Sequence, residues 1–162
     1  MEPIKYMTSL LTFYIKGEIK QEQNFVNLTK PNTILKLIPL GSKKESIPVS
    51  QLSSVESNFK LHFKEFLKGV AISLISLPLI VSAFPVGLIL LAIGANMVIT
   101  SFETILIIKT TSGDVKTVSF LIFEKAQAEE AERQIRQIIS SRLDDTNNRI
   151  QTDRIVEAIN NK

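Results

Sequence analysis

Few side chains in this sequence are of types that do chemistry, and their spacing does not bring them together. The chain has no cysteine and one histidine, His62, which excludes disulfides, thiolate nucleophiles and multi-histidine metal sites. Glu65 lies near His62 in the chain, but no nucleophile is placed for them to activate. Asp144 and Asp145 are adjacent in a polar stretch, which does not give the facing carboxylates of acid–base catalysis. We therefore expect no catalytic residue, no metal and no cofactor.

The composition indicates a folded chain with clustered apolar residues. Of 162 residues, 19 are Lys or Arg and 16 are Asp or Glu, so the net charge of +3 is too small to indicate nucleic-acid binding. Charged residues make up 22%, yet the mean hydropathy is +0.17. The apolar residues must therefore be concentrated in part of the chain.

That part is residues 69–102, which hold 34 consecutive positions without an ionisable side chain. A run of about 18 or more such residues is typical of a membrane-spanning helix. As one helix the run would be about 51 Å long, whereas a hydrocarbon core is about 30 Å thick and half the run gives about 25 Å. A single tilted span, a full hairpin and a re-entrant hairpin all remain open on length alone.

The middle of the run favours the hairpin. Phe84, Pro85 and Gly87 lie between two apolar halves, and proline and glycine both interrupt helices. Folding about this turn brings Asn96 to nearly the depth of Ser76. Because an amide in lipid needs a partner, we expect an Asn96–Ser76 contact. The alternatives are that Asn96 faces a neighbouring subunit or lies near the membrane surface.

Residues 58–68 are expected to form an amphipathic helical lead-in. Aromatic and basic residues alternate there at helical spacing: Phe59, Phe63 and Phe66, with Lys60, Lys64 and Lys68. The lysines serve either as a topology signal or in selective lipid recognition, and both interpretations remain open. By the positive-inside rule they keep both termini in the cytoplasm. Glu103 is expected to pair with Lys68 at the base of the hairpin.

Strand-like segments lie on both sides of the apolar run. Before it, strands are expected at residues 12–19, 24–28 and 33–38, with a turn at 39–44. Residues 46–49 contain a proline and are expected to form a short edge strand or the start of a strand, and residues 50–55 lead into another strand. After it, Ser112, Gly113 and Asp114 predict a hairpin turn between strands at 104–109 and 115–122. Residues 6–15 are apolar, but no small-residue cleavage site follows, so we do not interpret them as a signal peptide.

A helix is expected at residues 124–143, where alanine and isoleucine form one stripe. A polar break at 144–148 should end it, leaving residues 144–162 as a polar tail or short helix. Residues 1–68 and 103–143 are each too small and too open-edged to fold separately. We therefore expect them to form one β-rich domain around a transmembrane hairpin at 69–102, which returns the chain to the side it left.

This order of elements resembles that of bacterial pleckstrin-homology-like (PH-like) membrane proteins. Residues 46–55 are similar to the family's strand pattern of Ile-Pro, an apolar residue, Ser, and Leu and Val at fixed spacing. Residues 105–122 with their Ser-Gly-Asp turn, and 123–139 as a closing helix, extend the resemblance. It implies an α+β fold, in which a bent antiparallel sheet or barrel is closed by a C-terminal amphipathic helix. It also implies binding or scaffolding without a catalytic centre.

The leading functional hypothesis is a non-enzymatic module, anchored in a bacterial cell membrane, that binds a protein or lipid partner at the cytoplasmic face. Membrane lipids are expected partners in either case, and nucleic acid is not. The alternative is an immunity protein that protects the membrane from a bacteriocin or toxin, which rests on the resemblance. A channel is disfavoured because the spans lack a polar stripe. A fully soluble protein is also disfavoured, because its other 128 residues would have to cover the 34 uncharged ones.

Overall fold

The computed structural model describes residues 2–34 and 38–160. The strands in this part of the chain are β1 (Ile4–Met7), β2 (Lys16–Glu22), β3 (Phe25–Ile34), β4 (Ile38–Pro48), β5 (Leu52–Leu61), β6 (Phe102–Thr110) and β7 (Val115–Leu121). The helices are α1 (Phe63–Ser82), α2 (Phe84–Thr100) and α3 (Lys125–Asn160), with short 3-10 turns at Val49–Gln51 and Ile122–Glu124.

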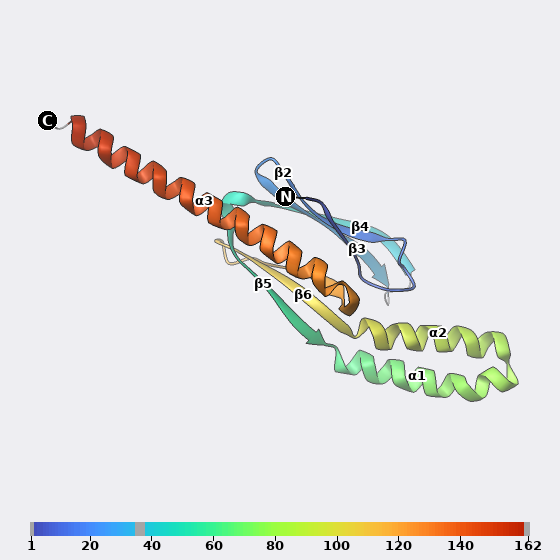
Figure 1. Cartoon of the computed structure of the whole chain (residues 1–162). Helices are drawn as coiled ribbons and strands as arrows, with labels where there is room; N and C mark the ends of the chain where they lie inside the picture. The colour runs from blue at the N-terminus through green and yellow to red at the C-terminus, as the bar shows by residue number, and fades with distance from the viewer. Residues whose placement is uncertain (1, 35–37, 161–162) are drawn as a thin grey trace.

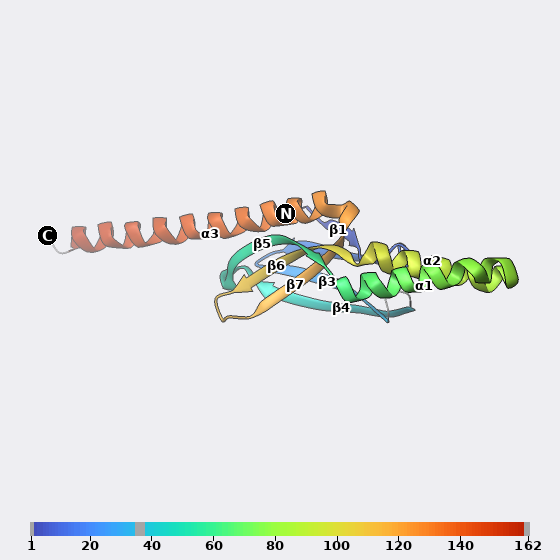
Figure 2. The ribbon, with the colours of Figure 1, turned by 90° about the horizontal axis from the view of Figure 1, so that it is seen from below.

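The strands form two antiparallel sheets, so the expected α+β class is confirmed (Figures 1 and 2). One sheet has the order β1-β2-β3-β4 and the other has the order β5-β6-β7. A shared core lies between them, and the rings of Tyr6 and Phe120 meet across it at 4.6 Å. The part of the chain that the structure describes has two separate sheets and no closed barrel.

Helix α3 packs on this core with its first half. Ala128, Ala131 and Ile135 are fully buried there. The helix then continues well beyond the sheets (Figure 1). The predicted break at residues 144–148 is wrong. That stretch contains neither glycine nor proline, and the hydroxyl of Thr146 donates to the Arg142 carbonyl oxygen at 2.9 Å within the helix.

Helices α1 and α2 are inserted between β5 and β6. These two strands pair directly, with Leu61 opposite Phe102 and Lys60 opposite Glu103. The chain therefore leaves the sheet and returns to the neighbouring position. The two helices lie side by side and extend from one end of the domain, while α3 extends from the other (Figures 1 and 2).

Of the two turns predicted from the sequence, one is present in the structure and the other is not. The turn at Ser112 to Asp114 is confirmed, and Gly113 has the positive φ of 86° that such a turn needs. The expected turn at residues 39–44 is wrong, because these residues belong to β4, with Gly41 at a bulge in its pairing with β3. The expected strand at 33–38 divides between the ends of β3 and β4, and its residues 35–37 lie outside the described residues.

The segment at residues 12–15 is a loop and not the start of a strand. Strand β1 ends at Met7 and β2 begins at Lys16, so residues 8–15 connect them. Ser9 and Thr12 are buried in this loop, while its large apolar side chains are exposed. Hydrogen bonds from the Ser9 hydroxyl and the Leu11 backbone to Asn96, described below, hold the chain here in place of the strand pairing that its β-propensity predicts.

Glu45 provides a test of the electrostatics of the first sheet. Its carboxylate lies 2.7 Å from Lys43 Nζ and 2.9 Å from Lys30 Nζ. These two ammonium groups lower the pKa of Glu45 to about 2. A carboxyl group whose pKa is lowered by folding stabilises the protein above its unfolded-state pKa, and that stabilisation is lost as the pH falls towards the folded-state value.

We therefore expect Glu45→Gln to lower the free energy of unfolding at pH 7 by about 1 kcal/mol. The difference from the wild type should shrink between about pH 4.5 and about pH 2. Thermal unfolding in detergent across this range measures it. Glu56→Gln is the control, because the Glu56–Lys109 pair is about half exposed and contributes less. Equal effects of both substitutions at pH 7 would contradict the prediction.

Candidate functional site

The contact surface between α1 and α2 is made of small residues. Gly69 and Ser76 are buried on α1, and Gly87 and Gly94 are buried on α2. A Cβ atom on Gly87 would lie 2.4 Å from the backbone nitrogen of Ile80, and one on Gly94 would lie 2.4 Å from the Ser73 hydroxyl. The helices therefore approach closely enough that these positions accommodate hydrogen atoms only.

The outer faces of the same two helices are apolar and uncovered. The large apolar side chains exposed there are Phe63, Leu67, Leu74, Ile75, Leu77, Val81, Phe84, Val86, Leu88 and Ile89. Val81 is 90% exposed, and Ile75 and Ile89 are each about 60% exposed. The pair of helices thus has the reverse of the usual arrangement in water, with small and polar groups inside and large apolar groups outside.

Helix α1 is long and apolar enough to cross a membrane, judged by its 20 residues and its composition. At about 1.5 Å per residue, it measures about 30 Å. Helix α2 is equally apolar but has 17 residues, which places it among the shorter apolar helices.

The residues predicted to form the turn lie just after it. Helix α1 ends at Ser82, α2 begins at Phe84, and Ala83 alone joins them. Pro85 falls in the first turn of α2, where a proline costs no hydrogen bond. Gly87 is a packing residue and not a turn residue, because it is one of the positions at which the backbone of α2 lies against α1.

The predicted Asn96–Ser76 contact is replaced by other hydrogen bonds. The Ser76 hydroxyl donates to the Ser73 carbonyl oxygen at 2.6 Å, within α1. The Asn96 Oδ1 atom accepts from the Ser9 hydroxyl at 3.1 Å and from the Leu11 backbone N–H at 3.3 Å. The reason is a shift in depth, since Gly94 lies against Gly69 and Ser73, which puts Asn96 nearer to the start of α1 than folding about Pro85 implies.

Four phenylalanine rings gather where the helices join the sheet. Phe63 and Phe66 are stacked with centroids 6.4 Å apart, and Phe102 contacts both Phe66 at 5.6 Å and Phe59 at 6.5 Å. The predicted helical lead-in at residues 58–68 is wrong in its first half, because Phe59 and Lys60 belong to β5. Phe102, which joins the cluster from β6, was missed, since its position follows from the pairing of β5 with β6.

The charged groups at the same place pair differently from the prediction. Lys68 Nζ lies 2.9 Å from Glu65 Oε1, and His62 Nε2 lies 3.3 Å from Glu103 Oε2. The backbone N–H of His62 also donates to the Ser101 carbonyl oxygen at 2.9 Å, which ties the start of α1 to the end of α2. Lys60, Lys64 and Lys68 are all exposed beside this junction.

A pocket of about 470 Å³ opens at the junction. Its walls come from both sheets and from the base of the helices, and they include Thr8, Asn32, His62, Glu65 and Glu103. These named groups are polar, and Pro31 and Met97 add apolar side chains to the lining. In the part of the chain that the structure describes, no group of three or more His, Cys, Asp or Glu side chains could hold a metal ion.

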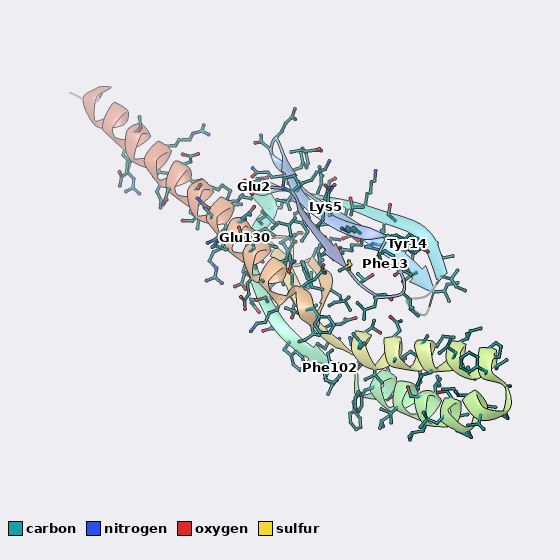
Figure 3. The ribbon with its side chains drawn as sticks, turned by 45° about the vertical axis from the view of Figure 1, so that its right-hand side comes forward. Glu2, Lys5, Phe13, Tyr14, Phe102 and Glu130 are labelled. Atoms are coloured by element: carbon teal, nitrogen blue, oxygen red, sulfur yellow. The ribbon has the colours of Figure 1, made fainter. Side chains whose placement is uncertain are left out.

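A second, larger hollow lies at the opposite end of the domain, where α3 leaves the sheets. This groove has a volume of about 860 Å³ and lies between α3 and the turn that joins β2 to β3. Figure 3 marks two of its residues, Glu2 near the N-terminus and Glu130 on α3. Its lining carries charges of both signs and several amides: Glu2, Gln21, Asn24, Glu130, Arg133, Gln134, Gln137, Arg142 and Asp145.

Comparisons with known proteins add no assignment, because no protein-family model, no curated protein and no solved structure matches this chain. The candidate site therefore rests on geometry alone. It consists of the apolar pair α1 and α2, their aromatic and basic junction with the sheets, and the polar groove at the far end.

Proposed function

We propose that this protein is a non-enzymatic binding module anchored in a cell membrane by α1 and α2, with the two sheets and α3 at the cytoplasmic face. The observation that carries the proposal is the reversed polarity of the helix pair. In water, so large an exposed apolar surface would drive aggregation. In lipid there is no hydrophobic force between helices, and close packing of small residues holds them together, as Gly69, Gly87 and Gly94 do here.

The β5–β6 pairing supports an anchor that enters and returns on one side. Lys60 pairs with Glu103 and Leu61 with Phe102, so both ends of the helix pair belong to one sheet and must share one compartment. The exposed lysines at the start of α1 support the cytoplasm as that compartment, by the positive-inside rule. The 30 Å length of α1, estimated at about 1.5 Å per residue, suits a hydrocarbon core of about 30 Å.

The arrangement of the domain supports the PH-like resemblance and, with it, a binding role. Antiparallel strands with a C-terminal helix on their core agree with the plan that the resemblance implies, although the described strands form two sheets and not one closed barrel. The groove beside α3 is the surface we assign to the partner. It lies at the end of the domain away from the anchor, and its mixed charges and amides suit a polar peptide segment of another protein better than a lipid tail.

Membrane extraction and labelling test the anchor. The chain has no cysteine, so single cysteines at Glu2 and Ser141 can be labelled specifically. We expect the protein to stay in membranes in alkaline carbonate and to need detergent for extraction. A membrane-impermeant maleimide should label both positions only after the inner face is exposed. Release by carbonate, or labelling of the two positions from opposite faces, would contradict the proposal.

Photo-crosslinking in intact cells tests the groove. A photoreactive residue at Gln137 should give a discrete adduct that disappears when Arg133→Glu reverses one charge of the lining. Arg133 suits this test because its side chain is 76% exposed and pairs only locally, with Glu130. The same photoreactive residue at Lys116, on β7, is the matched control and should give no such adduct. Absence of an adduct at Gln137, or the same adduct at Gln137 and Lys116, would exclude the groove as the binding surface.

A further inference from the structure

The loop at residues 8–15, between β1 and β2, has the same reversed polarity as the helix pair. Its polar residues Ser9 and Thr12 are 0% and 1% exposed. Its large apolar residues point outwards, with Phe13 and Tyr14 each 62% exposed and with Leu10 and Leu11 about 40% exposed. A loop in water normally has polar side chains outside, so this one is built for different surroundings.

Asn96 attaches the loop to α2. Its Oδ1 atom accepts hydrogen bonds from the hydroxyl of Ser9 and from the backbone of Leu11, while its side chain is almost fully buried. Helix α2 ends at Thr100, so Asn96 lies about one turn, or about 6 Å, inside the apolar helix. The loop is therefore held beside the last turn of α2, at a position along the helix axis that lies within the anchor.

The loop is also continuous with other exposed apolar groups at this end of the domain. Phe13 and Tyr14 lie at the end of the first sheet that is nearer to the helix pair (Figure 3). The neighbouring ends of β3 and β4 expose Ile34 and Ile38. Lys16, which follows the loop, is exposed and can reach towards phosphate groups.

We propose that loop 8–15 is a second membrane-contacting element, held against α2 by Asn96, which places Leu10, Leu11, Phe13 and Tyr14 in the boundary between headgroups and acyl chains. This inference rests on the proposed function, because it requires α2 to be in the bilayer. The occupant is lipid and not a second protein, since Asn96 fixes the loop at a depth where the helices themselves face lipid. Tyr14 has the amphipathic ring typical of that boundary. Together with the helix pair, the loop would fix the tilt of the whole domain on the membrane.

Depth-dependent quenching tests this directly, because the chain has no tryptophan and each introduced one is the only indole emitter. Three full-length variants are placed in phosphatidylcholine–phosphatidylglycerol vesicles whose acyl chains carry bromine near the headgroup end. Tyr14→Trp reports on the loop. Val81→Trp, at a position 90% exposed on α1, reports on the anchor. Val115→Trp, at the β6–β7 turn, reports on the end of the domain away from the anchor.

We expect bromine to remove about half of the Tyr14→Trp emission, because this side chain should lie at the boundary between headgroups and acyl chains. The emission of Val115→Trp should stay unchanged. Quenching of Val81→Trp without quenching of Tyr14→Trp would overturn the inference and leave the anchor intact. Absence of quenching at both positions would overturn the proposed function itself. A blue-shifted Tyr14→Trp emission that depends on protein concentration and not on bromine would identify a second copy as the occupant, and would also overturn the inference.

The role of Asn96 is tested in the same vesicles with Asn96→Ala. This substitution removes the acceptor for Ser9 and Leu11, so the quenching of Tyr14→Trp should fall towards the value of Val115→Trp. Val81→Trp combined with Asn96→Ala should stay quenched, which shows that the helices remain inserted. Unchanged quenching of Tyr14→Trp in the Asn96→Ala background would exclude Asn96 as the residue that positions the loop.

Discussion

The double substitution Ile75→Arg and Ile89→Arg is expected to release the protein from membranes. Both side chains are about 60% exposed, one on each helix of the anchor, and both lie on the outer faces. An arginine at the centre of a membrane-spanning helix costs about 2.5–3.5 kcal/mol on insertion scales, so two should lower the equilibrium constant for membrane insertion by about four to five orders of magnitude. Flotation of vesicles on a density gradient, with the protein followed by immunoblotting, measures this fraction.

The same double substitution should have the opposite effect on the fold and solubility of the protein if α1 and α2 were surrounded by water. If water surrounded the helices, exchanging two exposed isoleucines for arginines would remove apolar surface, improve solubility and leave the fold unchanged. Two further arginines at exposed positions outside the anchor, Val115→Arg and Ser53→Arg, are the matched control and should leave flotation unaffected. Retention of the Ile75 and Ile89 variant in the membrane fraction would contradict the anchor.

Features set by neighbouring residues could be predicted from the sequence. The turn at Gly113 is one example, because a glycine with positive φ between two β-branched runs is enough to specify it. The apolar run is another, since no tertiary contact is needed to recognise 34 residues without a charge. Antiparallel strands and a final amphipathic helix also follow from the pattern of elements. The division of the strands into two sheets, with no closed barrel in the described residues, does not follow from it.

Features set by long-range pairing could not be predicted. Phe59, Phe63 and Phe66 have helical spacing, but Phe59 is in a strand because β5 pairs with β6 across the whole inserted helix pair. Thr12 to Ile15 have the residue types of a strand, yet Asn96, more than 80 positions away, holds the neighbouring backbone in a loop. Sequence periodicity contains no information on such partners, so Phe102 and the groove beside α3 were the parts of the candidate site that were missed, and the role of the loop was missed as well.

The second large effect is expected at Gly87, where a side chain would collide with backbone and not with a movable group. Its Cβ atom would lie 2.4 Å from the nitrogen of Ile80 and 2.6 Å from the carbonyl carbon of Leu79. Gly87→Leu should therefore force α2 away from α1. Overpacking of this kind costs about 1–3 kcal/mol in ordinary cores. The cost should be at the upper end here, because close packing is the main force between helices in lipid.

Spin labels on cysteines introduced at the exposed positions Val81 and Val86 measure the separation of the helices in vesicles or detergent. We expect Gly87→Leu to lengthen and broaden the distance distribution and to lower the thermal unfolding midpoint. Ala92→Leu adds the same side chain to the same helix at an exposed position, so it should leave both quantities close to those of the parent. Equal behaviour of the two variants would mean that the small-residue contact surface does not hold the helices together. The close packing of small residues would then no longer support α1 and α2 as a membrane anchor.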